Sequence, residues 1–188
     1  MNPLDPDHRL PHSLPVEMDL KRQLELARFD RALEVAESLA QHRALLTTVE
    51  LARMNHIITG KTIEPWRQES VTLTLPSGRK ETLALIVEPT LIAREKLHRA
   101  TELAAQGAPV DAAVDIYVDL VLAHVFIDAN RRTAALASHY FLKRYDVSIS
   151  GVALHEIGLG DLREEGLIEQ FRRTVHQMVK FAEKRKTD

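Results

Sequence analysis

The spacing of apolar residues divides the chain into a series of predicted helices. Between Val16 and Asn55, leucine and alanine recur every three or four residues, which predicts two helices with a break near residues 42–48. Residues 110–126 are apolar almost throughout, so we expect a central, buried helix that opens after Pro109. Further helices are predicted over residues 89–106, 131–145 and 161–184, with a connector at 151–160 that has room for a short helix.

One segment has the alternation of a strand instead. Val71, Leu73 and Leu75 alternate with threonines, and a second β-prone run follows at residues 82–87. The sequence between the two runs, Pro76-Ser77-Gly78-Arg79, is typical of a turn and predicts a β-hairpin. A lone hairpin is marginal in water, so we expect it to pack on helices or to receive a partner strand along a free edge. The fold class is mainly α with one hairpin.

The composition is that of a globular domain. The 188 residues contain 25 Lys and Arg against 27 Asp and Glu, a formal charge of -2 that argues against direct nucleic-acid binding. Cysteine is absent, which excludes disulfides, cysteine-based zinc sites and thiolate nucleophiles. Apolar runs are too short to span a membrane and the first residues have no signal-peptide core, so we expect a cytoplasmic location without membrane partners.

The first residues differ from the rest of the chain. Residues 1–15 contain four prolines, so we expect a flexible arm there, followed by a single domain at 16–188. Within the domain, the buried helix carries three aspartates at i, i+4, i+8 spacing: Asp111, Asp115 and Asp119. A role toward a metal or a basic ligand is conceivable, but we expect these carboxylates to form one solvated seam.

The segment from His124 to Ala135 carries the chemistry of the sequence. It follows the buried helix and opens the next helix with Arg131 and Arg132. Helix N-termini favour negative charge, so two cations there are unfavourable unless an anion lies between them. The arginines, the Asn130 side chain and the exposed backbone amides together predict a phosphate-sized anion site.

Two further side chains of this segment extend the prediction from binding to chemistry. Asp128 would repel a phosphate directly, but it fits a site in which Mg²⁺ bridges the carboxylate and the phosphate oxygens. His124 lies at the end of the buried helix, where a neutral imidazole can take a proton from an incoming hydroxyl. Each residue alone is typical of an ordinary cap or surface position, and only their occurrence around one loop favours a functional site.

The stretch HVFIDANRRTA resembles the signature of the Fic/Doc (Fido) family. The Fic pattern runs His-x-Phe-x-Asp/Glu-Gly-Asn-Gly-Arg-x-x-Arg, and the Doc variant reads Ala-Asn-Lys-Arg-Thr-Ala after the acidic residue. The positions shared with both patterns are His124, Phe126, Asp128, Asn130 and Arg132, and those shared with Doc are Ala129, Thr133 and Ala134. Arg131 stands where Doc has Lys and most Fic proteins have Gly, and Ala135 stands where Fic has a second Arg.

The resemblance implies a helical bundle with one β-hairpin flap at about residues 70–88 and an active-site loop at 124–132. It implies that His124 is the catalytic base, that Asp128 holds Mg²⁺ and that Phe126 anchors the loop in the core. Trp66 and Arg67 resemble the approach of the family's chain to its flap. The nucleotide phosphates would be bound by Ala129, Asn130, Arg131 and Arg132. ATP or another nucleotide would be the donor, and a target protein bound along the hairpin would supply the hydroxyl.

Fic members commonly transfer AMP from ATP, whereas the Doc variant resembles a kinase. Arg131 fills space that a glycine would leave, and Ala135 removes a cation that Fic enzymes use for the terminal phosphate. The two departures favour transfer of the γ-phosphate, with AMP as the alternative. The inhibitory Ser/Thr-x-x-x-Glu-Gly/Asn pattern of many Fic proteins fails around Glu50, so we expect a separate antitoxin, as for a toxin, or no inhibitor.

Two other functions compete with this hypothesis. The altered positions 131 and 135 are compatible with a Fic-like module that binds a partner or nucleotide without turnover. A metal-dependent hydrolase would use His124 and Asp128 with His139 or His155 as a further ligand, but the spacing matches no metal-ligand motif.

Overall fold

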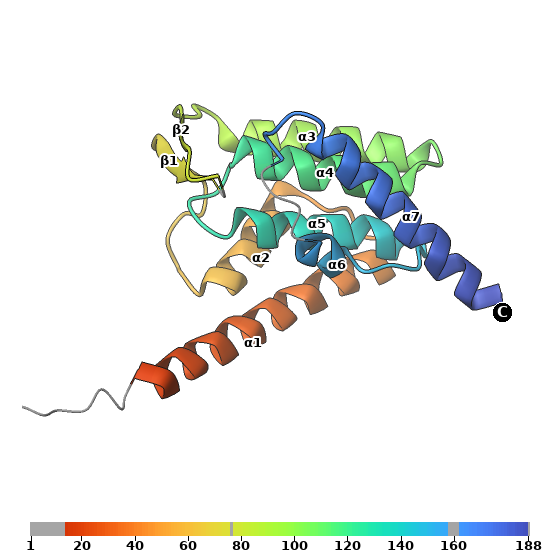
Figure 1. Cartoon of the computed structure of the whole chain (residues 1–188), viewed down its shortest axis with the longest axis horizontal. Coiled ribbons are helices and arrows are strands. Elements are labelled where there is room, and N and C mark those ends of the chain that lie inside the picture. The colour runs from red at the N-terminus through yellow and green to blue at the C-terminus, as the bar shows by residue number, and fades with distance from the viewer. Residues whose placement is uncertain (1–13, 76, 158–161, 188) are drawn as a thin grey trace, which may run out of the picture.

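The structure is a computed structural model that describes residues 14–75, 77–157 and 162–187. Within these residues, seven α-helices form one bundle and a two-stranded antiparallel hairpin projects from one end of it (Figure 1). The helices are α1 (Leu14–Gln41), α2 (Thr48–Thr59), α3 (Pro89–Ala105), α4 (Pro109–Ala123), α5 (Asn130–Arg144), α6 (Gly151–Glu156) and α7 (Leu167–Thr187), and the strands are β1 (Val71–Thr74) and β2 (Lys80–Leu83). The prediction of a mainly α fold with one hairpin is confirmed.

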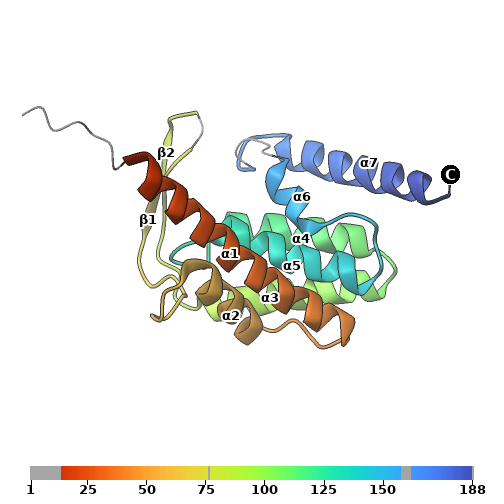
Figure 2. The ribbon, with the colours of Figure 1, turned by 90° about the horizontal axis from the view of Figure 1, so that it is seen from below.

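Helices α4 and α5 form the centre of the bundle. Helix α4 buries Ile116, Leu120 and most of its other side chains, as the continuous apolar run predicts. Helix α5 packs along α4 and is itself covered by α1, α2 and α6, while α3 and α7 pack on α4 (Figure 2). No helix among the described residues combines the length and the apolar character needed to cross a membrane.

The first two helices are separated where the sequence predicts a break. Helix α1 ends at Gln41, and Thr47 starts α2 by accepting a hydrogen bond from the backbone N–H of Glu50 (3.4 Å). Gly60, with φ of 65°, ends α2. The predicted arm at 1–15 falls largely outside the described residues, but Leu14 and Pro15 belong to the first turn of α1, where proline is tolerated.

The hairpin is shorter on its second side than predicted. Val71 to Thr74 of β1 pair with Lys80 to Leu83 of β2, and Gly78 takes the positive φ of the turn (80°); Pro76 lies outside the described residues. The second strand was expected at 82–87, and only Thr82 and Leu83 of that range belong to it, because pairing ends at Leu83. There the Nη1 atom of Arg67 donates to the carbonyl oxygens of Leu83 (3.4 Å) and Ala84 (2.8 Å), where a ladder would otherwise continue.

Two helix boundaries also differ from the prediction. Helix α4 ends at Ala123 and not at Phe126, because His124 adopts a left-handed conformation that takes the chain out of the helix. Helix α7 begins at Leu167 and not near residue 161; Gly166, with φ of 79°, directly precedes it. The early end of α4 matters most, since it places His124 at a helix terminus and frees the next residues to form a loop.

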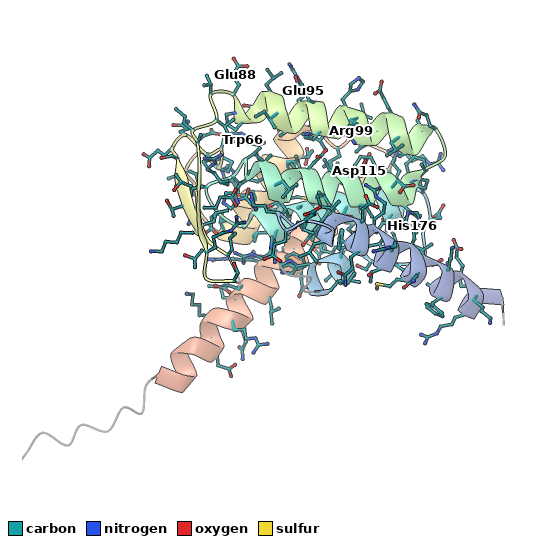
Figure 3. The ribbon with its side chains drawn as sticks, turned by 45° about the horizontal axis from the view of Figure 1, so that its top comes forward. Trp66, Glu88, Glu95, Arg99, Asp115 and His176 are labelled. Atoms are coloured by element: carbon teal, nitrogen blue, oxygen red, sulfur yellow. The ribbon has the colours of Figure 1, made fainter. Side chains whose placement is uncertain are left out.

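The three aspartates of α4 form ion pairs between helices, so the predicted solvated seam is wrong. Figure 3 shows Asp115 of α4 between Arg99 of α3 and His176 of α7. The pairs, with their N to O distances, are Asp111 with Arg172 (3.0 Å) and His176 (2.9 Å), Asp115 with Arg172 (2.6 Å) and Arg99 (3.3 Å), and Asp119 with Lys96 (3.4 Å). The stripe therefore attaches α3 and α7 to the central helix.

Candidate active site

His124 lies at the C-terminal end of α4 in a left-handed conformation, with φ of 50° and ψ of 52°. The backbone N–H of His124 donates to the carbonyl oxygen of Leu120 (3.0 Å), and the backbone carbonyl oxygen of His124 accepts from Nε of Arg67 (2.8 Å). Burial, together with the positive charges of Arg67 and Arg163, lowers the pKa of His124 to about 4, against the opposite effect of Asp128. The imidazole is therefore neutral at neutral pH and able to accept a proton.

The loop after His124 is closed by the side chain of Asn130. Its Oδ1 accepts from the N–H of Phe126 (2.9 Å), and its Nδ2 donates to the carbonyl oxygen of the same residue (2.9 Å). Asn130 is only 5% exposed. Its side chain thus holds the loop, a role that the sequence did not predict. The expected contact of this side chain with phosphate stays a prediction.

The segment that leads into the hairpin is attached to this loop. Arg67 N–H donates to the carbonyl oxygen of Val125 (2.8 Å), and Ile127 N–H donates to that of Pro65 (2.9 Å). Between these bonds, the rings of Trp66 and Phe126 stack with centroids 4.7 Å apart, and Phe126 is fully buried. Phe126 is therefore the core anchor that the resemblance implies, and the segment leading into the hairpin is attached to the loop after His124.

The first turn of α5 has no side-chain cap. The N-cap is Ala129, in a left-handed conformation with φ of 57°, and it brings no acceptor to the backbone amides of the turn. Those amides have no acceptor within the helix either. Arg131 and Arg132 extend from the same turn and line one cavity with Ala129 and Asn130. Amides and guanidinium groups directed at one space favour an anion there.

Asp128 lies between this turn and a lysine. Its Oδ1 accepts from the N–H of Ala129 (2.6 Å), and its Oδ2 lies 2.9 Å from Nζ of Lys61. The hydrogen bond from Lys61 is the largest influence that lowers the pKa of Asp128, so the carboxylate is ionised at neutral pH. An ionised carboxylate beside an anion site fits Mg²⁺, which binds through one or two carboxylates, phosphate oxygens and water.

The predicted site residues meet around a single cavity of about 570 Å³. Its volume is in the range of small-molecule sites. It is lined by Leu73, Thr74 and Leu75 of the hairpin side, Val121 and His124 of the α4 end, residues 127–132, His155 and Arg163. A larger cavity of about 850 Å³, lined by residues such as Glu64, Leu85, Val87 and Arg94, contains none of the predicted site residues. The first cavity is therefore the candidate active site.

Comparison with known families agrees with this geometry. The sequence model of the Fic/DOC family matches residues 33–142, more than half of the chain. The chain belongs to the Fic/DOC family. No curated protein sequence matches it.

Two solved structures share the Fic/DOC fold with this chain. A Fic domain containing signaling protein from Bacteroides thetaiotaomicron superposes with a TM-score of 0.67 at 18% identity, covering 85% of this chain and 69% of that one. Fic-1 (residues 134–508) from C. elegans superposes with a TM-score of 0.54, again at 18% identity, covering 85% of this chain and 48% of that one. Identities this low support the fold alone.

Some residues of the candidate site were missed from the sequence. Lys61 and Arg163 belong to no sequence motif, and Arg163 lies beyond the segment that the family model matches. Asn55 is 2% exposed, and its Nδ2 donates to the carbonyl oxygen of Asp128 (2.9 Å) and to Oγ1 of Thr133 (3.0 Å). A polar residue on the apolar side of a predicted helix was the signal that could have revealed Asn55.

His139 lies away from the cavity lining. The Nε2 of His139 lies 3.3 Å from Glu37, and its Nδ1 accepts from the N–H of Gly151 (3.2 Å), so His139 joins α1, α5 and α6. Burial lowers the pKa of His139. Among the described residues, no three His, Asp or Glu side chains are grouped to hold a metal ion.

Ala135, where the Fic pattern has a second arginine, is fully buried. Gly151 packs directly against it: a Cβ added to Gly151 would lie 2.6 Å from the carbonyl oxygen of Ala135 and 2.3 Å from the backbone nitrogen of His139. Helix α6 thus packs closely on the backbone of α5, and the buried alanine at position 135 brings no cation to the site.

Proposed function

We propose that this chain transfers a phosphate-containing group from a nucleoside triphosphate, ATP in the first instance, to a hydroxyl side chain of a target protein. The observation that carries the proposal is that one cavity is lined both by a neutral imidazole, His124, and by the cationic first turn of α5. The imidazole suits a base, and the turn suits the phosphates of the donor.

The donor would bind with its phosphates against the amides of α5, Arg131 and Arg132. Asp128 would hold Mg²⁺, which when bound neutralises charge on the phosphate oxygens. Since Lys61 contacts the same carboxylate in the structure, its ammonium group has to move from Oδ2 when a metal binds there.

The target hydroxyl would be delivered along the hairpin. The sheet has the order β1–β2, and Leu73 and Thr74 of β1 line the cavity that contains His124. A target segment that adds to the open edge of β1 gains backbone hydrogen bonds with little demand on its sequence. Such pairing holds a serine, threonine or tyrosine hydroxyl at a fixed distance from the imidazole.

The reaction is a substitution at phosphorus. The hydroxyl oxygen forms a bond to phosphorus as its proton passes to the ring of His124, and the bond from phosphorus to the leaving oxygen breaks. ADP leaves if the γ-phosphate is transferred, and pyrophosphate leaves if AMP is transferred. Negative phosphates near His124 raise its pKa, so the imidazole becomes a stronger base once the donor is bound.

The γ-phosphate is the transferred group that we favour. Position 135 is a buried alanine that offers no cation, and position 131 carries a guanidinium at the cavity. Both features support a donor orientation like that of the Doc variant. AMP transfer is the alternative within the same site.

Regulation from outside the chain is part of the proposal. The carboxylate of Glu50 lies 3.4 Å from Nη1 of Arg53 on the same helix and does not line the cavity of His124. A built-in inhibitory glutamate is therefore not supported at this position. A toxin that acts on cytoplasmic proteins and is controlled by a separate antitoxin fits this arrangement.

The test is transfer from ATP labelled with ³²P at the α or the γ position, in the presence of Mg²⁺ and a bacterial protein extract. We expect γ-label on a protein band, lost in His124→Asn, because asparagine tolerates the left-handed conformation but offers no base. His98→Asn, at an exposed position of α3, is the matched control. Transfer of the α-label identifies AMP transfer. Nucleotide binding by calorimetry without any transfer identifies a binding module, and absence of nucleotide binding overturns the proposal.

A further inference from the structure

Arg163 contacts the end of α4 from a segment outside the family match. Its Nη2 donates to the carbonyl oxygen of Leu122 (2.8 Å), with that of Val121 at 3.5 Å, and its side chain is only 12% exposed. These carbonyls belong to the last turn of α4, immediately before His124, where a helix has acceptors without partners in the helix and attracts cations. Its hydrogen bonds therefore fix Arg163 at the end of α4, next to His124.

The same guanidinium also reaches the hairpin. Nε of Arg163 lies 3.4 Å from Oε1 of Glu81, which is in β2 opposite Leu73 of β1. Leu73 lines the cavity that contains His124. One side chain thus connects the helix end that carries the base with the strand pair that forms the cavity wall.

Arg67 makes a comparable connection at the root of the hairpin. Its Nε donates to the carbonyl oxygen of His124 (2.8 Å), and its Nη1 donates to that of Ala84 (2.8 Å). Arg67 is 4% exposed and binds backbone atoms only in these contacts, so it fixes the point at which the hairpin leaves the bundle. The ion pair of Arg163 with Glu81 holds the hairpin farther along, at the middle of β2.

We propose that Arg163 is a positioning residue, which through Glu81 sets the place of the hairpin, and of a target segment bound to it, relative to His124. The inference rests on the proposed function for the roles of His124 and the hairpin. It assigns Arg163 to the delivery of the target and not to the binding of the donor.

Electrostatics gives the proposal an independent readout. The charged or titratable groups that face His124 are Arg67 from the hairpin root, Arg163, Asp128, and the cavity residues Arg131, Arg132 and His155. Arg67 and Arg163 both lower the pKa of His124, and Asp128 raises it. Removal of the charge at 163 therefore raises the pKa of His124, whereas removal of the charge of Glu81 leaves Arg163 in place and does not raise it.

The experiment compares Arg163→Met and Glu81→Gln, with Arg79→Met as the matched control. Arg79 also pairs with Glu81 (3.9 Å), but this pair stays within the hairpin. Two readouts need no substrate. NMR titration of the His124 ring is expected to show a raised pKa in Arg163→Met alone, and hydrogen exchange of the hairpin amides is expected to accelerate in Arg163→Met and Glu81→Gln but not in Arg79→Met.

Kinetics supplies the third readout. Arg163→Met and Glu81→Gln are each expected to lower kcat/KM for the target about ten-fold, because a small displacement of the target hydroxyl slows the reaction. The Kd for ATP is expected to stay that of the unaltered chain. Arg163→Lys, which keeps the charge, is expected to recover part of the loss. Unchanged hairpin exchange in Glu81→Gln, or a loss of ATP affinity equal to the loss of target kcat/KM, overturns the proposal. If the unaltered chain transfers no group at all, the proposed function fails, and the titration and exchange results still decide whether Arg163 holds the hairpin to the end of α4.

Discussion

The ammonium nitrogen of Lys61 lies 2.9 Å from Oδ2 of Asp128, the carboxylate assigned to magnesium in the proposed function. Lys61 directly follows Gly60, which ends α2, so the lysine reaches the active-site loop from a different part of the fold. Both side chains are about half exposed, so the pair is accessible to solvent and readily broken. In the proposed function, a metal ion would therefore compete with this lysine for the carboxylate of Asp128.

Replacing Lys61 by methionine is expected to lower the Mg²⁺ concentration needed to saturate the site. An exposed ion pair contributes about 0.2–1 kcal/mol, so the gain in apparent Mg²⁺ affinity is at most about five-fold. Calorimetric titration with Mg²⁺ in the presence of a non-hydrolysable ATP analogue measures the change. Lys21→Met on α1 is the control, and an unchanged or weaker Mg²⁺ affinity in Lys61→Met contradicts competition for Asp128.

The pH dependence of transfer follows from the low pKa of His124. The base must be neutral, so activity is present above its pKa and is lost as the pH falls through that value. Because burial and two arginines lower the pKa to about 4, the acid limb of kcat/KM for the nucleotide is expected near pH 4 and not near the ordinary value of 6.5. The acid limb of kcat is expected at higher pH, since the bound phosphates favour the imidazolium. Limbs in the reverse order would argue against His124 as the base.

Asn130→Ala is expected to destabilise the whole chain as well as the site. The substitution removes two hydrogen bonds and leaves the buried N–H and carbonyl oxygen of Phe126 without partners, at a cost of about 2–4 kcal/mol. Urea unfolding measures this loss in the free energy of unfolding. Arg132→Met provides the contrast: it should weaken ATP binding with little change in the free energy of unfolding. Equal stability of Asn130→Ala and the unaltered chain would show that Asn130 does not hold the loop.

Ala135→Arg is expected to unfold the chain or to destabilise it by several kcal/mol, and not to add a cation to the cavity. Ala135 is fully buried, so the arginine would overpack the core and take its charge out of water. Thermal unfolding with ATP titration tests this, with Ala105→Arg at the exposed end of α3 as the control. A folded Ala135→Arg with tighter ATP binding would refute this account of position 135.

Much of the site could be predicted because it is local in sequence. His124, Asp128, Asn130, Arg131 and Arg132 lie within nine positions, and a helix end followed by a loop and a helix start brings such neighbours to one cavity. What each side chain does there was less predictable. The side chain of Asn130 is of a type that can bind phosphate, yet its amide group is hydrogen-bonded to the backbone of Phe126.

Residues that are distant in sequence could not be assigned. Asn55, Lys61 and Arg163 act on the loop over separations of tens of residues, and their pairing depends on how α2, the hairpin and the segment before α7 pack. The aspartates of α4 show the same limit. Their spacing predicts one helix face, but the cations that pair with them lie on α3 and α7.

The sequence by itself determined the order of the helices, the hairpin and the loop at 124–132, because apolar periodicity, turn residues and a contiguous motif are properties of neighbouring positions. The tertiary structure decided which cations surround His124, how deeply position 135 is buried, and how the hairpin is held against α4. Those features depend on contacts between segments far apart in the chain, and the geometry of such contacts is set only when the helices pack around a common core.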